Sequence, residues 1–273
     1  MTALDGSFPD RDKTRDKVSL KAVALPTEHG GWSLTAEPAI LGLIVAWSWS
    51  GLALALAAML AFVTRTPVKV VLVDRHRRRW LPRTRLALVI SAVEIMVLVG
   101  LAVAAWRSAE QQFWVPLAAA APLILLELWY DMRSRSRRLL PELAGTVGIG
   151  SIAAAIGLAG GVTTSVAVGL WCVIGARSAA AIPYVRCQIL RTKSHPAPFW
   201  TSDLAQIVSV IVVVVGWLLA AVPLAAVLVV ACVGCLNLLA LRQPPRRAVV
   251  IGIQQMVFGS LVVAVTAIAV RAG

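Results

Sequence analysis

The sequence predicts an all-helical bundle that crosses a membrane about nine times. Of the 273 residues, 59% are hydrophobic and only 14% are charged, against roughly 25% charged residues in soluble domains. The apolar residues gather in runs close to the ~20 residues that a spanning helix needs. This composition excludes a soluble globular protein and a disordered chain, and the runs lack the alternation of a membrane β-barrel.

Nine apolar runs are separated by short polar connections. Because lipid offers no hydrogen bonds, the backbone of each run must bond within its own segment, and a helix is the structure that does so. We expect spanning helices over residues 32–47, 51–73, 86–106, 114–130, 141–160, 164–186, 203–221, 223–241 and 248–270.

The connections alternate in charge along the chain. Twenty-one Lys and Arg residues lie in residues 1–31 and in every second connection, whereas only Arg107 and Arg271 lie on the opposite side. Cytoplasmic loops carry such an excess of Lys and Arg, so we expect a cytoplasmic N-terminus, an outer C-terminus and an odd number of spans. The net charge of +13 then reflects contact with anionic membrane lipids, and no nucleic-acid partner is expected.

The chain is expected to divide into a cytoplasmic tail and entry segment, residues 1–31, and a transmembrane bundle, residues 32–273. A shift of 112 residues aligns Arg65 with Arg177, which suggests an internal repeat, although basic loops recurring every two spans would imitate part of it. A four-helix unit would give two parallel copies. The expected parts are a first repeat over 32–140, a second over 141–247 and a ninth helix over 248–273.

Six charged residues lie within the predicted spans, where a central charge costs ~2.5–3.5 kcal/mol on insertion scales and is usually functional or paired. The basic ones are Arg65, Lys69 and Arg177, and the acidic ones are Glu37, Glu94 and Glu127. One interpretation pairs them internally, for example Arg65 with Glu94 and Arg177 with Glu37. The other is an anionic-ligand site, because an Arg fork binds phosphate or carboxylate and Lys adds a point charge.

The ligand interpretation predicts two polar stripes that descend toward the cytoplasmic side. Arg65 and Lys69 share a helix face that continues to His76, and a second stripe follows Arg177 along its own helix. The predicted ligand contacts are Arg65, Lys69, Arg177, Tyr184 and Arg186, with His29 near the mouth of the cavity. No metal or cofactor is expected, since the pair Cys232 and Cys235 lies in an apolar run without further ligands.

Several motifs resemble a known family. Residues 25–32 read L-P-T-E-H-G-G-W and are followed by Glu37-Pro38, Arg65-Thr66-Pro67 and, over 140–145, L-P-E-L-A-G. These motifs are similar to those of the YwiC-like family of bacterial integral membrane proteins. The resemblance implies a multi-pass protein of the bacterial inner membrane but no particular activity.

The expected architecture also resembles UbiA-type polyprenyl transferases, which have nine helices and a cytoplasm-facing cavity between two four-helix halves. Those enzymes hold a prenyl diphosphate through Mg²⁺ and Asp-rich motifs on the second and sixth helices. Here the matching stretches read R-T-P-V-K-V-V-L-V-D over 65–74 and R-S-A-A-A-I-P-Y-V-R over 177–186. The resemblance therefore implies the scaffold without the Asp-rich motifs.

Together these observations predict an integral inner-membrane protein that binds an anionic or amphipathic ligand in a cytoplasm-facing cavity. A phosphorylated or isoprenoid lipid is among the candidate ligands. A divergent transferase acting on a lipid substrate and a transporter are the alternatives, and the sequence leaves open whether the protein is an enzyme.

Overall fold

The computed structural model describes residues 26, 29–135 and 137–273, and the folded part within these ranges is entirely helical. Most of the expected tail, residues 1–25 and 27–28, lies outside this description. The prediction of an all-helical polytopic bundle is confirmed. The helices are α2 His29–Val45, α3 Trp49–His76, α4 Pro82–Ser108, α5 Trp114–Met132, α6 Leu139–Ala159, α7 Thr164–Thr192, α8 Phe199–Leu218, α9 Leu224–Arg242 and α10 Ala248–Ala272.

Eight of these helices, α3 to α10, are long and apolar enough to cross a membrane, and α2 is a shorter apolar helix of 17 residues. At 1.5 Å per residue α2 is about 25 Å long, the lower limit for a span. It ends at Val45 because the chain turns at once into α3, whose N-cap Ser48 accepts a hydrogen bond from the Gly51 N–H.

Two helices extend beyond their expected ends on the basic side. α3 continues to His76 instead of residue 73, and α7 continues to Thr192 instead of residue 186. Their last turns carry Arg75, His76 and Arg191, and cations stabilise the C-terminal end of a helix dipole. The apolar run therefore ends before the helix does.

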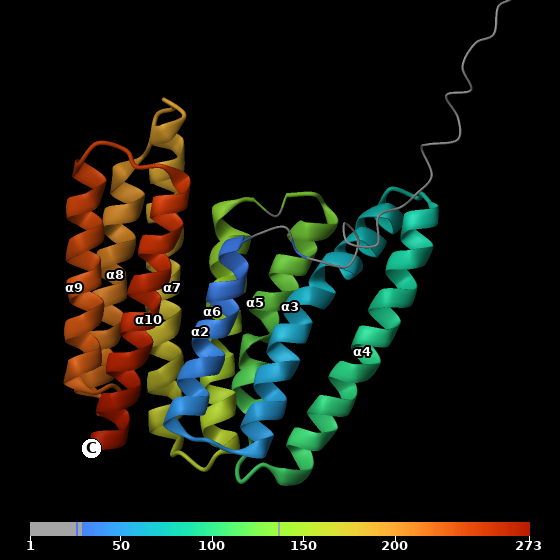
Figure 1. Cartoon of the computed structure of the whole chain (residues 1–273), viewed down its shortest axis with the longest axis horizontal. Helices are drawn as coiled ribbons and strands as arrows, with labels where there is room; N and C mark the ends of the chain where they lie inside the picture. The colour runs from blue at the N-terminus through green and yellow to red at the C-terminus, as the bar shows by residue number, and fades with distance from the viewer. Residues whose placement is uncertain (1–25, 27–28, 136) are drawn as a thin grey trace, which may run out of the picture.

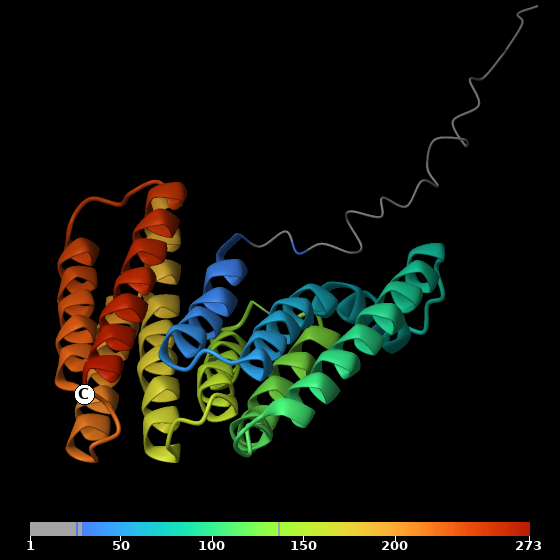
Figure 2. The same ribbon diagram turned by 60° about the horizontal axis from the view of Figure 1, so that its bottom comes forward.

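The helices form two neighbouring groups (Figure 1). α7, α8, α9 and α10 stand on one side, and α3, α4, α5 and α6 stand on the other with α2 between them and α10. α2 and α6 each pack against both α3 and α7, so they join the two groups. α4 lies at the outer edge, where its main neighbour is α3 (Figure 2).

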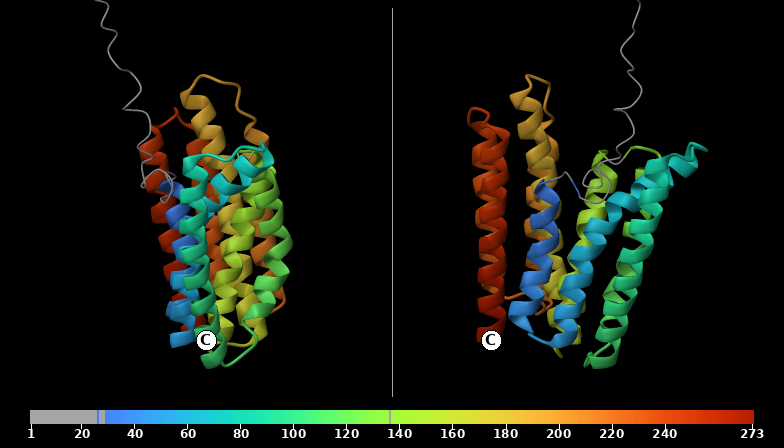
Figure 3. Two further views of the ribbon diagram at one scale, coloured as in Figure 1. Left: turned by 90° about the vertical axis from the view of Figure 1, so that its right-hand side faces the viewer. Right: turned by 45° about the vertical axis from the view of Figure 1, so that its right-hand side comes forward.

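All helices run roughly along one direction, so the connections gather at two ends (Figure 3). The basic α3–α4, α5–α6, α7–α8 and α9–α10 connections meet at one end, which we call the basic end. The C-terminus lies at the opposite end. The basic connections that alternate along the sequence are thus gathered at one end of the bundle.

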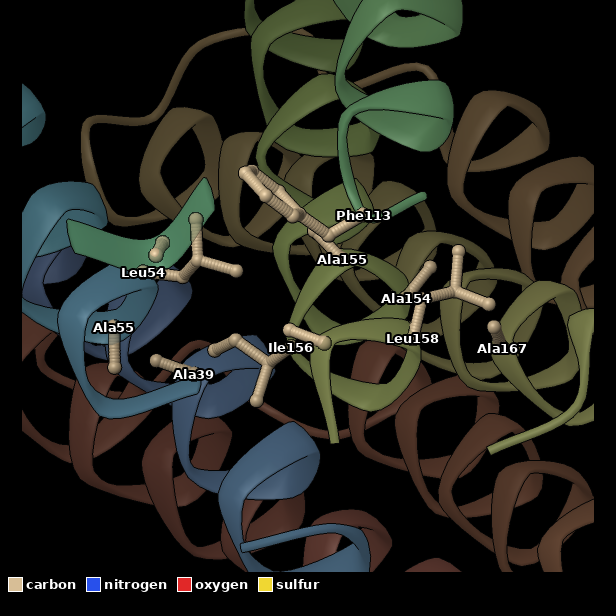
Figure 4. Close-up of a cluster of buried hydrophobic side chains, with 11 residues drawn as sticks. Ala39, Leu54, Ala55, Phe113, Ala154, Ala155, Ile156, Leu158 and Ala167 are labelled. Atoms are coloured by element: carbon tan, nitrogen blue, oxygen red, sulfur yellow. The ribbon is translucent and has the colours of Figure 1, made fainter. Parts of the chain in front are cut away.

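Small side chains decide which helix is central. The buried cluster in Figure 4 is dominated by alanines, and α6 contributes Ala154, Ala155 and Ile156 to it. Ala and Gly residues let helix backbones approach closely because they carry a methyl group or no side chain, so α6 packs against α2, α3, α5 and α7. α4 instead carries exposed Val, Ile and Met side chains, as expected of a helix that faces lipid.

Candidate functional site

A cluster of four charged side chains joins α3 to α5. Arg65 contacts Glu127 at 2.7 Å (Nη2 to Oε1) and Asp131 at 2.9 Å (Nε to Oδ2). Lys69 contacts the other oxygen of Asp131 at 3.2 Å. The two cations are four residues apart on α3 and the two carboxylates four residues apart on α5, so each pair occupies one helix face. Both cations remain about one third exposed, at 30% and 32%.

A glycine on α6 makes room for this cluster. A Cβ atom added to Gly145 would lie 2.2 Å from Glu127 Oε2, well inside van der Waals contact. Gly145 belongs to the L-P-E-L-A-G motif singled out in the sequence. Its lack of a side chain lets α6 pack directly over the carboxylate that Arg65 holds.

A second ion pair is buried between the two groups of helices. Arg177 of α7 contacts Glu37 of α2 at 3.0 Å (Nη1 to Oε2), and the two side chains are only 2% and 7% exposed. Arg177 also donates a hydrogen bond to the backbone carbonyl of Gln255 on α10. Gly259, on the same helix, faces Glu37 so closely that an added Cβ would lie 2.0 Å from Oε1.

The pair continues into a chain of buried amides that crosses the second half of the bundle. Gln255 Nε2 donates to Asn237 Oδ1 at 2.9 Å, and Asn237 Nδ2 donates to Gln206 Oε1 at 3.4 Å. Gln206 Nε2 then donates to the carbonyl of Ala180 at 2.9 Å. From Glu37 onward this network links α2, α7, α10, α9 and α8. No motif in the sequence indicated it, because isolated Gln and Asn residues in apolar helices carry no spacing signal.

The remaining predicted contacts of α7 form hydrogen bonds and an ion pair with groups other than Arg65. Tyr184 is fully buried, and its hydroxyl accepts hydrogen bonds from Gln188 at 3.2 Å and Gln254 at 3.4 Å. Arg186 contacts Glu142 at 2.8 Å and donates to the carbonyl of Arg137 at 2.9 Å. Outside α7 itself, Tyr184 and Arg186 therefore bind to α6, α10 and the α5–α6 connection.

Glu94 and His29 are the two other predicted site residues. Glu94 of α4 lies beside Thr64 of α3, whereas Arg65, the cation expected to pair with it, contacts Glu127 and Asp131 of α5. The side chain of His29 lies outside the described part of the structure. Asp131, which completes the α3–α5 cluster, was missing from the predicted set, although its spacing of four residues from Glu127 was a visible signal.

Asp74, the one Asp left in the region of the Asp-rich motifs, closes the α3–α4 connection. Its carboxylate accepts hydrogen bonds from Arg83 at 2.7 and 3.1 Å and from the Thr84 hydroxyl at 2.6 Å. Asp74 is 1% exposed. Within the described residues, no group of three or more His, Cys, Asp or Glu side chains is placed to hold a metal ion.

A cationic pocket of about 320 Å³ opens at the basic end above the α3–α5 cluster. It is lined by His76 of α3 and by Arg133 and Arg135 of the α5–α6 connection. The Arg133 guanidinium lies over the Trp129 ring, 4.3 Å from its centre. His76 lies eleven residues, about three helical turns, beyond Arg65, so the polar stripe predicted along α3 leads to this pocket.

This arrangement of apolar helices and basic connections defines an integral membrane protein of the polytopic helical class. Residues 25–157 match the family model described as YwiC-like protein, so the resemblance seen in the motifs is confirmed over this part of the chain. The match ends inside α6. Neither curated proteins nor solved structures give a match, and the UbiA-like scaffold therefore stays a prediction.

Proposed function

We propose that the protein binds an anionic amphiphile whose headgroup is held by the cations of α3 and the α5–α6 connection. The observation that carries this proposal is the partial exposure of Arg65 and Lys69, at 30% and 32%, on a face that leads to the cationic pocket. Arg177, at 2%, is enclosed with its partner Glu37 and serves the packing of helices.

The side chains that line the pocket favour a negatively charged ligand. Its lining consists of two Arg residues and one His, and Arg binds phosphate or carboxylate oxygens through two parallel hydrogen bonds. The pocket lies at the basic end of the bundle, and we expect lipid headgroups to meet the protein at the ends of its spanning helices. An acyl or isoprenoid tail then extends along the apolar helices, and a soluble anion would gain no such contact.

The distribution of Lys and Arg also bears on the orientation of the protein in the membrane. We propose that the basic end faces the cytoplasm of a bacterial cell and that the protein resides in the inner membrane, because Lys and Arg gather in cytoplasmic loops. The N-terminus is then cytoplasmic and the C-terminus is outside. The anionic cytoplasmic leaflet supplies the amphiphile directly to the pocket.

The test compares two double variants with the same change in charge. Arg133→Gln with Arg135→Gln alters the pocket, and Arg246→Gln with Arg247→Gln alters the α9–α10 connection at the same end of the bundle. Native mass spectrometry after purification in a mixture of phosphatidylglycerol and phosphatidylcholine measures the retained anionic lipid. We expect the first variant to lose it preferentially, also in the presence of excess chelator. Equal loss in both variants would show that only general surface charge attracts the lipid.

Transport is a second candidate function, favoured by the buried pair of Glu37 and Arg177 between the two groups of helices. Transporters place charged sites at the interface of two bodies that move against each other. Flux of the anionic amphiphile across liposomes that contain the protein would support transport. A lipid-soluble product without flux would instead support a transferase.

A further inference from the structure

A lateral groove of about 570 Å³ runs along the second half of the bundle, apart from the cationic pocket. α7 forms its floor with Gly175 and Ala179, α6 forms one wall with Leu143 and Val147, and α8 forms the other with Leu204 and Val208. Two of the polar groups along it form hydrogen bonds within the protein. The Trp171 indole donates to the carbonyl of Val147 at 2.8 Å, and the Thr201 hydroxyl donates to that of Pro198 at 2.7 Å.

The length of the groove corresponds to one leaflet of a bilayer. Its floor extends along α7 from Trp171 to Pro183, and twelve residues of helix rise about 18 Å. Half of a ~30 Å hydrocarbon core is about 15 Å. Leu139, at the start of α6, and Trp200, at the start of α8, line the end of the groove that lies toward the basic end. The groove thus opens to the leaflet at the basic end.

The mouth of the groove carries positive charge. α6 and α8 both begin there, and neither has a hydrogen bond from an N-cap side chain, so both helix dipoles point their positive ends toward the mouth. Glu142, in the first turn of α6, offsets part of this positive charge. Arg138 immediately precedes α6. Arg186, one turn beyond Pro183 on α7, is 39% exposed while it contacts Glu142. Apolar walls below a positive mouth match a hydrocarbon chain below a negative headgroup.

We propose that this groove is a lipid site that holds one acyl chain of an anionic phospholipid from the leaflet at the basic end, with the phosphate at the mouth. A second copy of the protein fits less well, because it would bring an equally positive basic end alongside this one. The groove is also concave, whereas α4, the most lipid-exposed helix, offers a convex surface. This site is independent of the proposed function, which concerns α3 and the α5–α6 connection.

Two glycines provide a matched pair of variants for the test. A Cβ atom at Gly175 would meet only Trp171 and Val147, at 3.8 and 3.9 Å, with no neighbouring backbone within 4 Å, so Gly175→Leu is expected to fill the groove. Gly100 on α4 has nothing within 4 Å of its Cβ position, and Gly100→Leu is the control. Both changes replace a helical glycine with the same apolar residue. Ala179→Leu is a second groove-filling variant, in case Gly175→Leu folds poorly.

The probe is phosphatidylglycerol with a diazirine at the end of one acyl chain, in nanodiscs of phosphatidylcholine. After illumination, peptide mass spectrometry should find the label near Trp171, Cys172 and Val212, which line the far end of the groove. Gly175→Leu or Ala179→Leu should lower this labelling about tenfold, equivalent to about 1.4 kcal/mol of binding free energy. Gly100→Leu should leave it unchanged.

Three results would overturn the inference. Equal labelling by a phosphatidylcholine probe with the same chain would remove the preference for an anionic lipid. Unchanged labelling in both groove-filling variants would place the chain elsewhere. A dimer in native mass spectra that Gly175→Leu abolishes would show that a second copy covers the groove. The variant Arg133→Gln with Arg135→Gln should still be labelled in the groove, so failure of either proposal leaves the other separately testable.

Discussion

Removing one partner of the buried pair between Glu37 and Arg177 should destabilise the whole bundle. Their charged groups are 3.0 Å apart, and the side chains are 7% and 2% exposed. In Arg177→Leu the Glu37 carboxylate stays buried without its cation, and Glu37→Leu leaves the guanidinium in the same position. The double variant leaves no charge between α2 and α7.

The expected magnitude follows from the distance and the burial. At 3.0 Å the attraction is about 5–6 kcal/mol for an effective dielectric constant of about 20, and it offsets the cost of burying both ions. Removing one partner of a buried pair costs ~3–5 kcal/mol, while replacing both by apolar residues is often close to neutral. The double variant also loses the hydrogen bond from Arg177 to the Gln255 carbonyl, about 1 kcal/mol. The coupling energy should therefore exceed ~2 kcal/mol.

The assay is the melting temperature of the four proteins of the cycle, measured in one detergent by size-exclusion chromatography after heating. For a chain of this size, roughly 2–4 °C corresponds to 1 kcal/mol, so each single variant should melt roughly 6–20 °C lower than the parent. The matched control is the cycle between Arg242 and Asp203, whose ion pair of 2.8 Å joins α9 to α8 with side chains 52% and 26% exposed. Exposed pairs contribute ~0.2–1 kcal/mol.

Additive effects at Glu37 and Arg177 would refute the reasoning. They would mean that each charge is compensated separately, for example by water that enters between the two groups of helices. Coupling equal to that of the exposed control pair would lead to the same conclusion. Such a result would favour a hydrated interface and hence the transport candidate.

The other predictions concern the close packing, the amide network and the orientation. Gly145→Ala should cost ~1–3 kcal/mol of stability, measured as melting temperature, because its Cβ would displace Glu127; Gly100→Ala, which meets no neighbour, should not lower it. Gln206→Leu should cost ~1–3 kcal/mol because it leaves the Asn237 amide N–H without its acceptor and removes the hydrogen bond to the Ala180 carbonyl; an unchanged melting temperature would contradict a structural role of the network. Reporter fusions in the basic connections should be cytoplasmic and a fusion at the C-terminus should be external; a cytoplasmic C-terminus would disprove the orientation.

For the candidate site, the sequence identified several of the charged residues but not which residues pair with each other. Charges within apolar runs singled out Arg65, Arg177 and Glu37 without knowledge of the fold, because charge in a spanning helix is rare. Their ion-pair partners could not be identified from the sequence in the same way. One interpretation of the sequence paired Arg65 with Glu94, but the sequence does not show which neighbouring helix a charged residue faces. In the structure the face of α5 that carries Glu127 and Asp131 lies against α3, so these two carboxylates form the ion pairs with Arg65 instead.

The sequence by itself determined that this protein is a helical membrane protein, where its helices run and which connections share one end. Those features depend on the local density of apolar and basic residues, since lipid imposes helical structure on any long apolar segment. Only the tertiary structure decided that α6 is central, that side-chain amides from α8, α9 and α10 form a network that reaches Arg177, and that a groove lies between α6 and α8. In a membrane nearly every helix face is apolar, so the sequence does not distinguish faces that pack together from those that meet lipid. Packing of small residues between particular helices makes that distinction.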